Sequence, residues 1–137
     1  MGLMDCRRID ARNLRDPRGA LTIWEAGDHL AYDVKRVFIL HDLSPGASRG
    51  NHAHRECHQL FIAFGGPVRI RIDDGRAQRI ETVEGPAEGL HVPPMIWVTI
   101  EELPAGAYLM VACSHRYDEA DYIRDREAFD ILTGGTP

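Results

Sequence analysis

The sequence predicts an all-β fold of the sandwich, jelly-roll or barrel type. About eight short runs of β-forming residues follow one another along the 137-residue chain, separated by turn-forming Gly and Pro residues. Such spacing is typical of double-sheet and closed β architectures. The chain length suits one hydrophobic core, and a content of 44% hydrophobic and 27% charged residues is an ordinary globular balance.

The first two predicted strands lie in the N-terminal third of the chain. Residues 20–24 (ALTIW) are rich in β-forming side chains and follow the turn-like sequence DPRG at residues 16–19. Residues 35–41 (KRVFILH) have the same character and end at a loop that contains Pro45 and Gly46. Each of the two runs therefore predicts one strand.

The middle of the chain predicts a buried strand followed by a hairpin. Residues 59–64 (QLFIAF) form a nearly continuous apolar run that ends at Gly-Gly-Pro. In residues 68–72 (VRIRI) apolar and charged side chains alternate strictly, which is the period of a half-buried strand. The dipeptide Asp74-Gly75 is a hairpin turn signal, and residues 78–83 supply the returning strand.

The C-terminal third predicts three more strands, at residues 90–92, 96–100 and 108–113, and then a helix. Residues 118–132 are rich in helix-forming residues and carry Asp and Glu early, where a helix N-terminus favours negative charge. We expect this helix to cover the edge or rim of a barrel that spans residues 16–115. The whole chain, residues 1–137, then forms one domain.

Charge and composition exclude several classes of function. The chain has 16 basic and 21 acidic residues, a net charge of −5, which argues against a nucleic-acid partner. No stretch approaches the ~18 apolar residues of a membrane span, and the first residues lack the apolar region of a secretory signal. The scattered cysteines Cys6, Cys57 and Cys113 form no CxxC pair, so we expect reduced thiols in the cytoplasm.

The segment with the clearest chemical signal is residues 49–59, RGNHAHRECHQ. His52 and His54 are two positions apart, so on a strand both imidazoles point to the same face, roughly 7 Å apart along the chain. A glycine-bearing loop precedes them and an apolar strand follows, which predicts that this face is the inside of the barrel. Two interpretations then compete: the histidines are metal ligands, or they carry protons.

This segment resembles the first motif of the cupin superfamily of double-stranded β-helix, or jelly-roll, barrels. The motif is G-x5-H-x-H-x3,4-E-x6-G, and Gly46, His52 and His54 fit it. Its Glu is missing, because the two allowed spacings fall on His58 and Gln59.

The second cupin motif, G-x5-P-x-G-x2-H-x3-N, would place its histidine at Val98. Two of the four usual metal ligands are therefore missing, and a catalytic divalent metal usually has three protein ligands. We expect no metal, and we favour a site in which the histidines transfer protons.

Motifs spread over residues 16–129 carry a closer resemblance: DPRGALTIWE, KRVFIL, RGNHAH, the DDG turn, GLHVPPMIW and YDEADYIRDREAF. On them the chain resembles the sugar-nucleotide 3,4-ketoisomerases, cupin-fold enzymes that act on dTDP-4-keto-6-deoxy-glucose in deoxyamino-sugar pathways. RGxHAH together with YDExDYIR is a much more specific combination than H-x-H alone.

The resemblance implies an activity and a site. The two histidines of the HAH motif, His52 and His54, would carry the protons while the ketone moves from C4 to C3 through an enediol. Imidazole suits this task because its ordinary pKa is about 6.5. The resemblance also implies a homodimer, no metal or other cofactor, and a nucleotide diphosphate at the barrel mouth.

Five further residues are candidates for substrate binding. Arg49 offers a fork of donors to a diphosphate, and Gln59 offers an amide to sugar hydroxyls, although a buried structural amide is the alternative. Trp97 lines the pocket or stacks on a base, with a plain core position as the alternative. His58 and His91 stand where relatives show Glu and Tyr.

Three positions depart from the family pattern and keep alternatives open. Phe38 and Ile39 replace a pair of tyrosines, and Val98 stands where relatives have His, so the proton carrier on the oxygen side is not identified. The alternatives are a 3,5-epimerase-like sugar-nucleotide enzyme and a non-catalytic nucleotide-sugar-binding cupin. A metal-dependent cupin enzyme is a further alternative.

Overall fold

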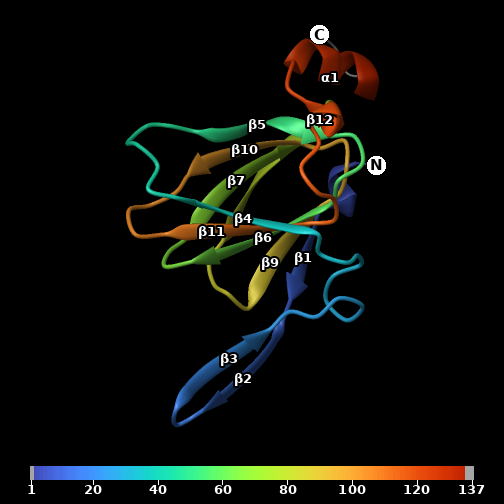
Figure 1. The fold of residues 1–137 in the computed structure, drawn as a ribbon. Helices are drawn as coiled ribbons and strands as arrows, with labels where there is room; N and C mark the ends of the chain where they lie inside the picture. Colours follow the sequence, from blue (N-terminus) through green and yellow to red (C-terminus); the bar gives the residue numbers. More distant parts are fainter. Residues whose placement is uncertain (1, 135–137) are drawn as a thin grey trace.

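The computed structural model describes residues 2–134 and contains two five-stranded antiparallel sheets that face each other (Figure 1). The first sheet has the order β1-β9-β6-β11-β4, the second has the order β12-β5-β10-β7-β8, and β2 and β3 form a separate hairpin. The strands are β1 (Arg7–Asp10), β2 (Arg12–Asp16), β3 (Gly19–Ile23), β4 (Arg36–His41), β5 (Arg49–His54), β6 (Gln59–Phe64), β7 (Val68–Asp73), β8 (Gln78–Val83), β9 (Glu88–Val92), β10 (Trp97–Glu102), β11 (Tyr108–Cys113) and β12 (Tyr122–Ile123).

Strands far apart in the sequence are neighbours in both sheets, as in a jelly roll. This confirms the predicted all-β cupin fold. The core lies between the two sheets because each strand turns alternate side chains inward. In β7 the apolar members of VRIRI, Val68, Ile70 and Ile72, are fully buried, as the alternation predicted.

The predicted strands from residue 20 to residue 113 are all present within one or two residues of their expected ends. Four strands were not among the eight predicted runs: β1, β2, β5 and β12, of which β5 is the segment on which the two histidines were assumed to lie on a strand. Strands β1 and β2 are short and rich in arginine, and every residue of β2 is exposed, so no apolar alternation marks them. The barrel therefore begins before residue 16, since β1 pairs with β9 in the first sheet.

The prediction of one helix over residues 118–132 is wrong for its first half. Residues 119–121 form the short 3-10 helix η2 (Glu119–Asp121), β12 follows it, and only α1 (Arg126–Thr133) is α-helical. Asp125 caps α1, because its side chain accepts a hydrogen bond from the backbone N–H of Glu127. None of the helices in the described part of the chain is long and apolar enough to cross a membrane.

Two apolar surfaces stay uncovered. The β2–β3 hairpin projects from the end of the sheets opposite to α1 (Figure 1), and its paired residues Leu14 and Leu21 are 45% and 59% exposed. On the first sheet, four large side chains point outward from β4, β6 and β11. We call this set the outer apolar patch: Val37, Ile39, Phe64 and Tyr108.

Candidate active site

A β-bulge in β5 sets the position of the histidine pair. His52 lies opposite Val98 of β10 and Gly50 lies opposite Thr99, so Asn51 is an extra residue with no partner in β10. Asn51 has a φ of 58°, in the left-handed region that Asn tolerates. Gly50 has a φ of 89°, and a Cβ there would lie 2.7 Å from the backbone oxygen of Val98. Only glycine fits at this point of the bulge.

His52 and His54 face the space between the sheets, as the i, i+2 spacing predicted. Their ring centroids are 5.0 Å apart and the rings are nearly perpendicular, at 87°. The Nδ1 atom of His52 lies 3.0 Å from the backbone oxygen of Gly50, and Nδ1 of His54 lies 2.9 Å from Oδ2 of Asp121. Each ring is therefore held by one nitrogen.

These contacts fix the tautomers of both rings. A carbonyl oxygen only accepts hydrogen bonds, so the Nδ1–H of His52 donates to Gly50 and its Nε2 carries the lone pair. Burial raises the pKa of Asp121, but the hydrogen bonds from His54 and from the N–H of Glu56 have the larger combined effect. The net pKa is lowered, so this carboxylate is ionised. Nδ1–H of His54 therefore donates to Asp121, and Nε2 of His54 also carries a lone pair.

Both imidazoles are neutral near pH 7. Burial lowers the pKa of His52 to about 4, although the bond to Gly50 opposes this change. Burial also lowers the pKa of His54, against the opposing effect of Asp121. The structure thus presents two neutral bases side by side.

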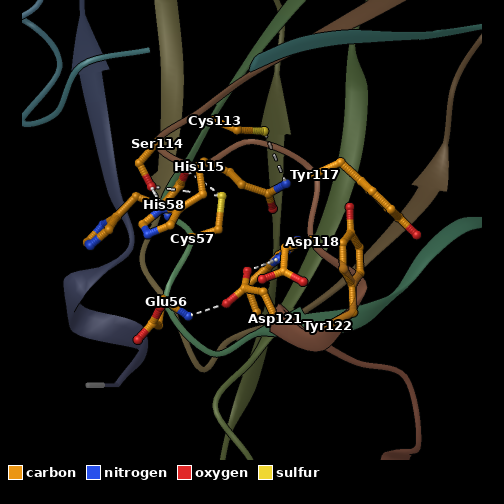
Figure 2. A network of polar contacts seen from close by, with 12 residues as sticks. Glu56, Cys57, His58, Cys113, Ser114, His115, Tyr117, Asp118, Asp121 and Tyr122 are labelled. Carbon is orange, nitrogen blue, oxygen red and sulfur yellow. Dashed lines mark hydrogen bonds and ion pairs between the residues drawn. The ribbon is translucent and has the colours of Figure 1, made fainter. Parts of the chain in front are cut away.

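Asp121 holds the C-terminal segment against β5. Besides the bond from His54, it accepts a hydrogen bond of 2.7 Å from the backbone N–H of Glu56 (Figure 2). The next residue, Tyr122, pairs with His54 across β12 and β5. Its ring centroid lies 4.4 Å from that of His54 and 4.9 Å from that of His52.

A cavity of about 540 Å³ opens between the sheets beside this pair. Its size suits a ligand of a few hundred daltons. The cavity contains three arginines, Arg36, Arg49 and Arg124, and no Asp or Glu among the described residues that line it. The remaining lining residues are Phe38, Leu40, Ser48, Gly50, Asn51, His52, Gln59, Phe61, Val98, Ile100, Tyr117 and Tyr122. The cavity therefore favours an anionic ligand with apolar and ring-shaped parts.

The structure brings some of the predicted site residues together. His52, Arg49 and Gln59 line the cavity, and the His54 ring lies next to that of His52, with only 4% of its surface exposed. Gln59 is buried, and its amide N–H also lies 3.8 Å from Sγ of Cys113.

The other three predicted binding residues do not line this cavity. His58 and His91 lie toward the outer side of the first sheet, where Nδ1 of His58 is 3.1 Å from Nε2 of His91 and Tyr32 packs beside both rings. Trp97 points to the outer side of the second sheet and packs on Phe129 of α1, with ring centroids 5.5 Å apart. Trp97 thus occupies the core position that was its alternative.

The residues at the cavity do not fit a divalent metal ion. His52 is the single histidine among the described residues that line the cavity and faces Val98 in register, and those lining residues include no carboxylate and no cysteine. Within residues 2–134, one group of three possible ligands lies close together: His54, Cys57 and Asp121, with ligand atoms within 4.8 Å of one another. The Asp121 oxygens in that group are already bonded to His54 and to Glu56.

Comparison with known proteins assigns the family. A sequence model of the family described as "FdtA: WxcM-like, C-terminal" matches residues 4–133. The chain belongs to the FdtA family. This confirms the resemblance to the 3,4-ketoisomerases that the motifs indicated.

Relatives of this FdtA-family chain are named TDP-sugar 3,4-ketoisomerases. It is 32% identical over 126 residues to the TDP-4-oxo-6-deoxy-alpha-D-glucose-3,4-oxoisomerase of Aneurinibacillus thermoaerophilus. The aligned residues make up 92% of this chain and 91% of the relative. The crystal structure of QdtA, a sugar 3,4-ketoisomerase from Thermoanaerobacterium thermosaccharolyticum in complex with TDP, matches with a TM-score of 0.91 at 30% identity over 96% of both chains. The TDP-quinovose 3,4-ketoisomerase WlaRB from Campylobacter jejuni matches with a TM-score of 0.88 at 31% identity, over 94% of this chain and 99% of that one.

Four residues at the site were not among the predicted site residues: Arg36, Asp121, Tyr122 and Arg124. The last three belong to the YDEADYIR segment. Because this motif is specific, its match to the family could have indicated these residues as site candidates. Arg36 starts an alternation with Phe38 and Leu40 that places all three on the inner side of β4. Nothing in the sequence distinguishes that arginine from a solvent-exposed one.

Proposed function

We propose that this FdtA-family chain is a metal-independent isomerase of sugar nucleotides. It moves the ketone of dTDP-4-keto-6-deoxy-glucose from C4 to C3 through an enediol, as a step in deoxy- or deoxyamino-sugar biosynthesis. The observation that carries the proposal is the pair of neutral imidazoles, His52 and His54, beside a cavity with three arginines. The activities named for its relatives support it.

His52 is proposed to move the proton between the two carbons. It lines the cavity and presents a lone pair at Nε2, so it can take the proton from C3 and return it to the adjacent C4. One base can serve both carbons because they are bonded neighbours. Its lowered pKa keeps it in the basic form at neutral pH.

His54 is proposed to act on the oxygen side, as the base that takes the proton from the C3 hydroxyl. Its Nε2 is buried and has no hydrogen-bond partner among the described residues, and its Nδ1 is held by Asp121. A buried acceptor without a partner is costly unless a ligand supplies the donor. A sugar hydroxyl is such a donor.

The diphosphate is proposed to bind Arg49 and Arg124 of the cavity. Arg49 begins β5, and Arg124 follows β12. Guanidinium groups bind phosphate oxygens through paired, charge-assisted hydrogen bonds. His58 and His91 remain proposals for contacts outside this cavity, which a bound nucleotide would have to extend to reach; Trp97 is not proposed as a contact, because it packs in the core.

The test of the function is an NMR time course in D₂O with dTDP-4-keto-6-deoxy-glucose and chelator-treated protein. We expect a 3-keto sugar to form with deuterium at C4, with no added metal. Exchange at C3 and C5 without ketone migration would instead indicate an epimerase. Activity that returns only with a divalent metal would indicate a metal-dependent cupin, and binding without exchange would indicate a non-catalytic one.

We also propose that the enzyme is a homodimer in which a second copy covers the outer apolar patch. Val37 and Ile39 on the edge strand β4 are 51% and 52% exposed, and edge strands with apolar surface tend to pair with another chain. The projecting hairpin offers a second apolar contact through Leu14 and Leu21.

The dimer is tested by light scattering on wild type and on a double variant, Val37→Lys and Ile39→Lys. Wild type is expected at twice the chain mass and the variant at the single mass, because two lysines in the interface would repel their copies. Ile131→Lys, a change at an exposed apolar residue of α1, is the control and keeps the dimer. A monomeric wild type contradicts the proposal.

The cytoplasm remains the proposed location. Cys6, Cys57 and Cys113 are all buried free thiols, which fit a reducing compartment.

A further inference from the structure

The proposed isomerisation needs a proton donor that the two histidines do not supply. When the base takes the proton from C3, negative charge develops on O4 and a proton must reach that oxygen. Nδ1–H of His52 is bonded to Gly50 and Nδ1–H of His54 is bonded to Asp121, so both Nε2 atoms can only accept. The first step therefore requires an acid from another residue.

Two phenols line the cavity, and only one is available. The hydroxyl of Tyr117 donates to Oε2 of Glu119 at 2.5 Å, and 61% of this residue is exposed. Tyr122 is half-buried, and its ring packs against both His52 and His54. Apart from a contact with Arg36, no hydrogen bond of the Tyr122 hydroxyl is present among the described residues.

Arg36 lies beside the Tyr122 hydroxyl. Its Nη1 donates to the Tyr122 oxygen at 3.3 Å, and its Nε is buried without a partner among residues 2–134. A guanidinium at this distance stabilises the phenolate that remains after proton donation. The guanidinium of Arg124 lies over the face of the same ring, 4.3 Å from its centroid, and its charge is paired with the carboxylate of Glu119.

We propose that Tyr122 is the proton donor to O4 in the reaction, with Arg36 as the residue that stabilises its phenolate; this rests on the proposed function.

His52 takes the C3 proton, and the C3–H electron pair forms the C3=C4 bond. The electron pair of the carbonyl moves to O4, which receives the Tyr122 proton. His54 then takes the O3 proton, O3 forms its double bond to C3, and C4 takes the proton back from His52. Finally the protonated His54 returns its proton to the Tyr122 phenolate, so the enzyme is unchanged.

The test compares Tyr122→Phe with wild type in the ketoisomerase assay. The variant keeps the ring that packs on both histidines and loses only the hydroxyl. We expect kcat to fall by about 10²–10⁴-fold, the usual contribution of a positioned acid, while the affinity for TDP and the melting temperature stay at wild-type values. Tyr32→Phe is the matched control, because the Tyr32 hydroxyl bonds the backbone oxygen of Ala112 outside the cavity; it keeps wild-type kcat.

A second readout separates acid catalysis from packing. Replacing Tyr122 by a fluorinated tyrosine, whose phenol is more acidic, is expected to shift the basic limb of the pH–rate profile to lower pH. If Tyr122 acted only by packing on the histidines, the basic limb of the profile would not shift. Wild-type kcat in Tyr122→Phe, or an unshifted limb, overturns the proposal; a wild type without isomerase activity overturns the proposed function itself.

Discussion

His52 illustrates how burial prepares a side chain for its task. In water an imidazole is partly protonated near pH 6.5, and a protonated ring is no base. The bulge in β5 places His52 between the sheets, and the loss of solvent disfavours the charged ring, so its pKa falls to about 4. The spacing of two residues was enough to predict the shared face of His52 and His54, but the tautomers depend on Gly50 and Asp121 in the folded chain.

The lowered pKa of His52 predicts an acid-tolerant enzyme. The basic forms of His52 and His54 persist as pH falls through 6.5, so kcat/KM, which reports the free enzyme, is expected to have its acidic limb below pH 6.5. The measurement is a pH–rate profile over the range in which circular dichroism shows folded protein. An acidic limb centred near 6.5 contradicts this account.

At the scale of the elements, β5 depends on a glycine. Gly50→Ala places a Cβ 2.7 Å from the backbone oxygen of Val98, whereas Gly46→Ala, at a similar positive φ, meets no atom within 4 Å. We expect Gly46→Ala to cost about 1 kcal/mol of unfolding free energy through its φ alone. Gly50→Ala should cost about 1–3 kcal/mol more because of the clash.

Urea denaturation of the two glycine variants checks this expectation. Gly50→Ala should also lower kcat, because the bulge sets the position of His52, while Gly46→Ala should not. Equal unfolding free energies for the two variants would show that the register of β5 and β10 does not depend on Gly50.

The C-terminal segment shows which secondary structure the local sequence does not predict. Residues 118–132 have a helical composition, and a helix from 126 does form. Residues 119–123 do not join it, because Asp121 bonds His54 and Tyr122 pairs in β12 with β5. These partners lie more than 60 residues away in the chain, and a local pattern contains no information about them.

At the scale of the whole molecule, alternation and turn signals were enough to predict two apolar sheet faces around one core. VRIRI, QLFIAF and the Asp-Gly hairpin are local features, and each became the expected strand or turn. The order of strands within the sheets follows from the family resemblance and not from these patterns. The three arginines of the cavity come from separate segments and could not be grouped before the fold was known.

Partly buried histidines make the stability of the molecule depend on pH. Burial lowers the pKa of both His52 and His91 to about 4, while an unfolded chain has histidines near 6.5. Between these values the unfolded chain binds more protons, so the unfolding free energy is expected to decrease as pH falls from about 6.5 to about 4. Urea denaturation at several pH values measures this.

The variant His91→Gln is expected to weaken that pH dependence, since it removes one of the shifted groups. His41→Gln, a change at an exposed histidine, is its control. A stability that is constant from pH 6.5 to pH 4 would contradict the burial of these rings.

The bond between His54 and Asp121 joins residues 67 positions apart. It can therefore form only late in protein synthesis, after residue 121 has been added. Ribosomes release the N-terminal part first, so the strands up to β11 can collapse into a barrel before Asp121 and Tyr122 have been made. At that stage His54 has no carboxylate to fix its tautomer, and the cavity lacks a wall. We therefore expect a chain that ends before residue 121 to lack activity, because both the Asp121 contact to His54 and the Tyr122 pairing with β5 are missing.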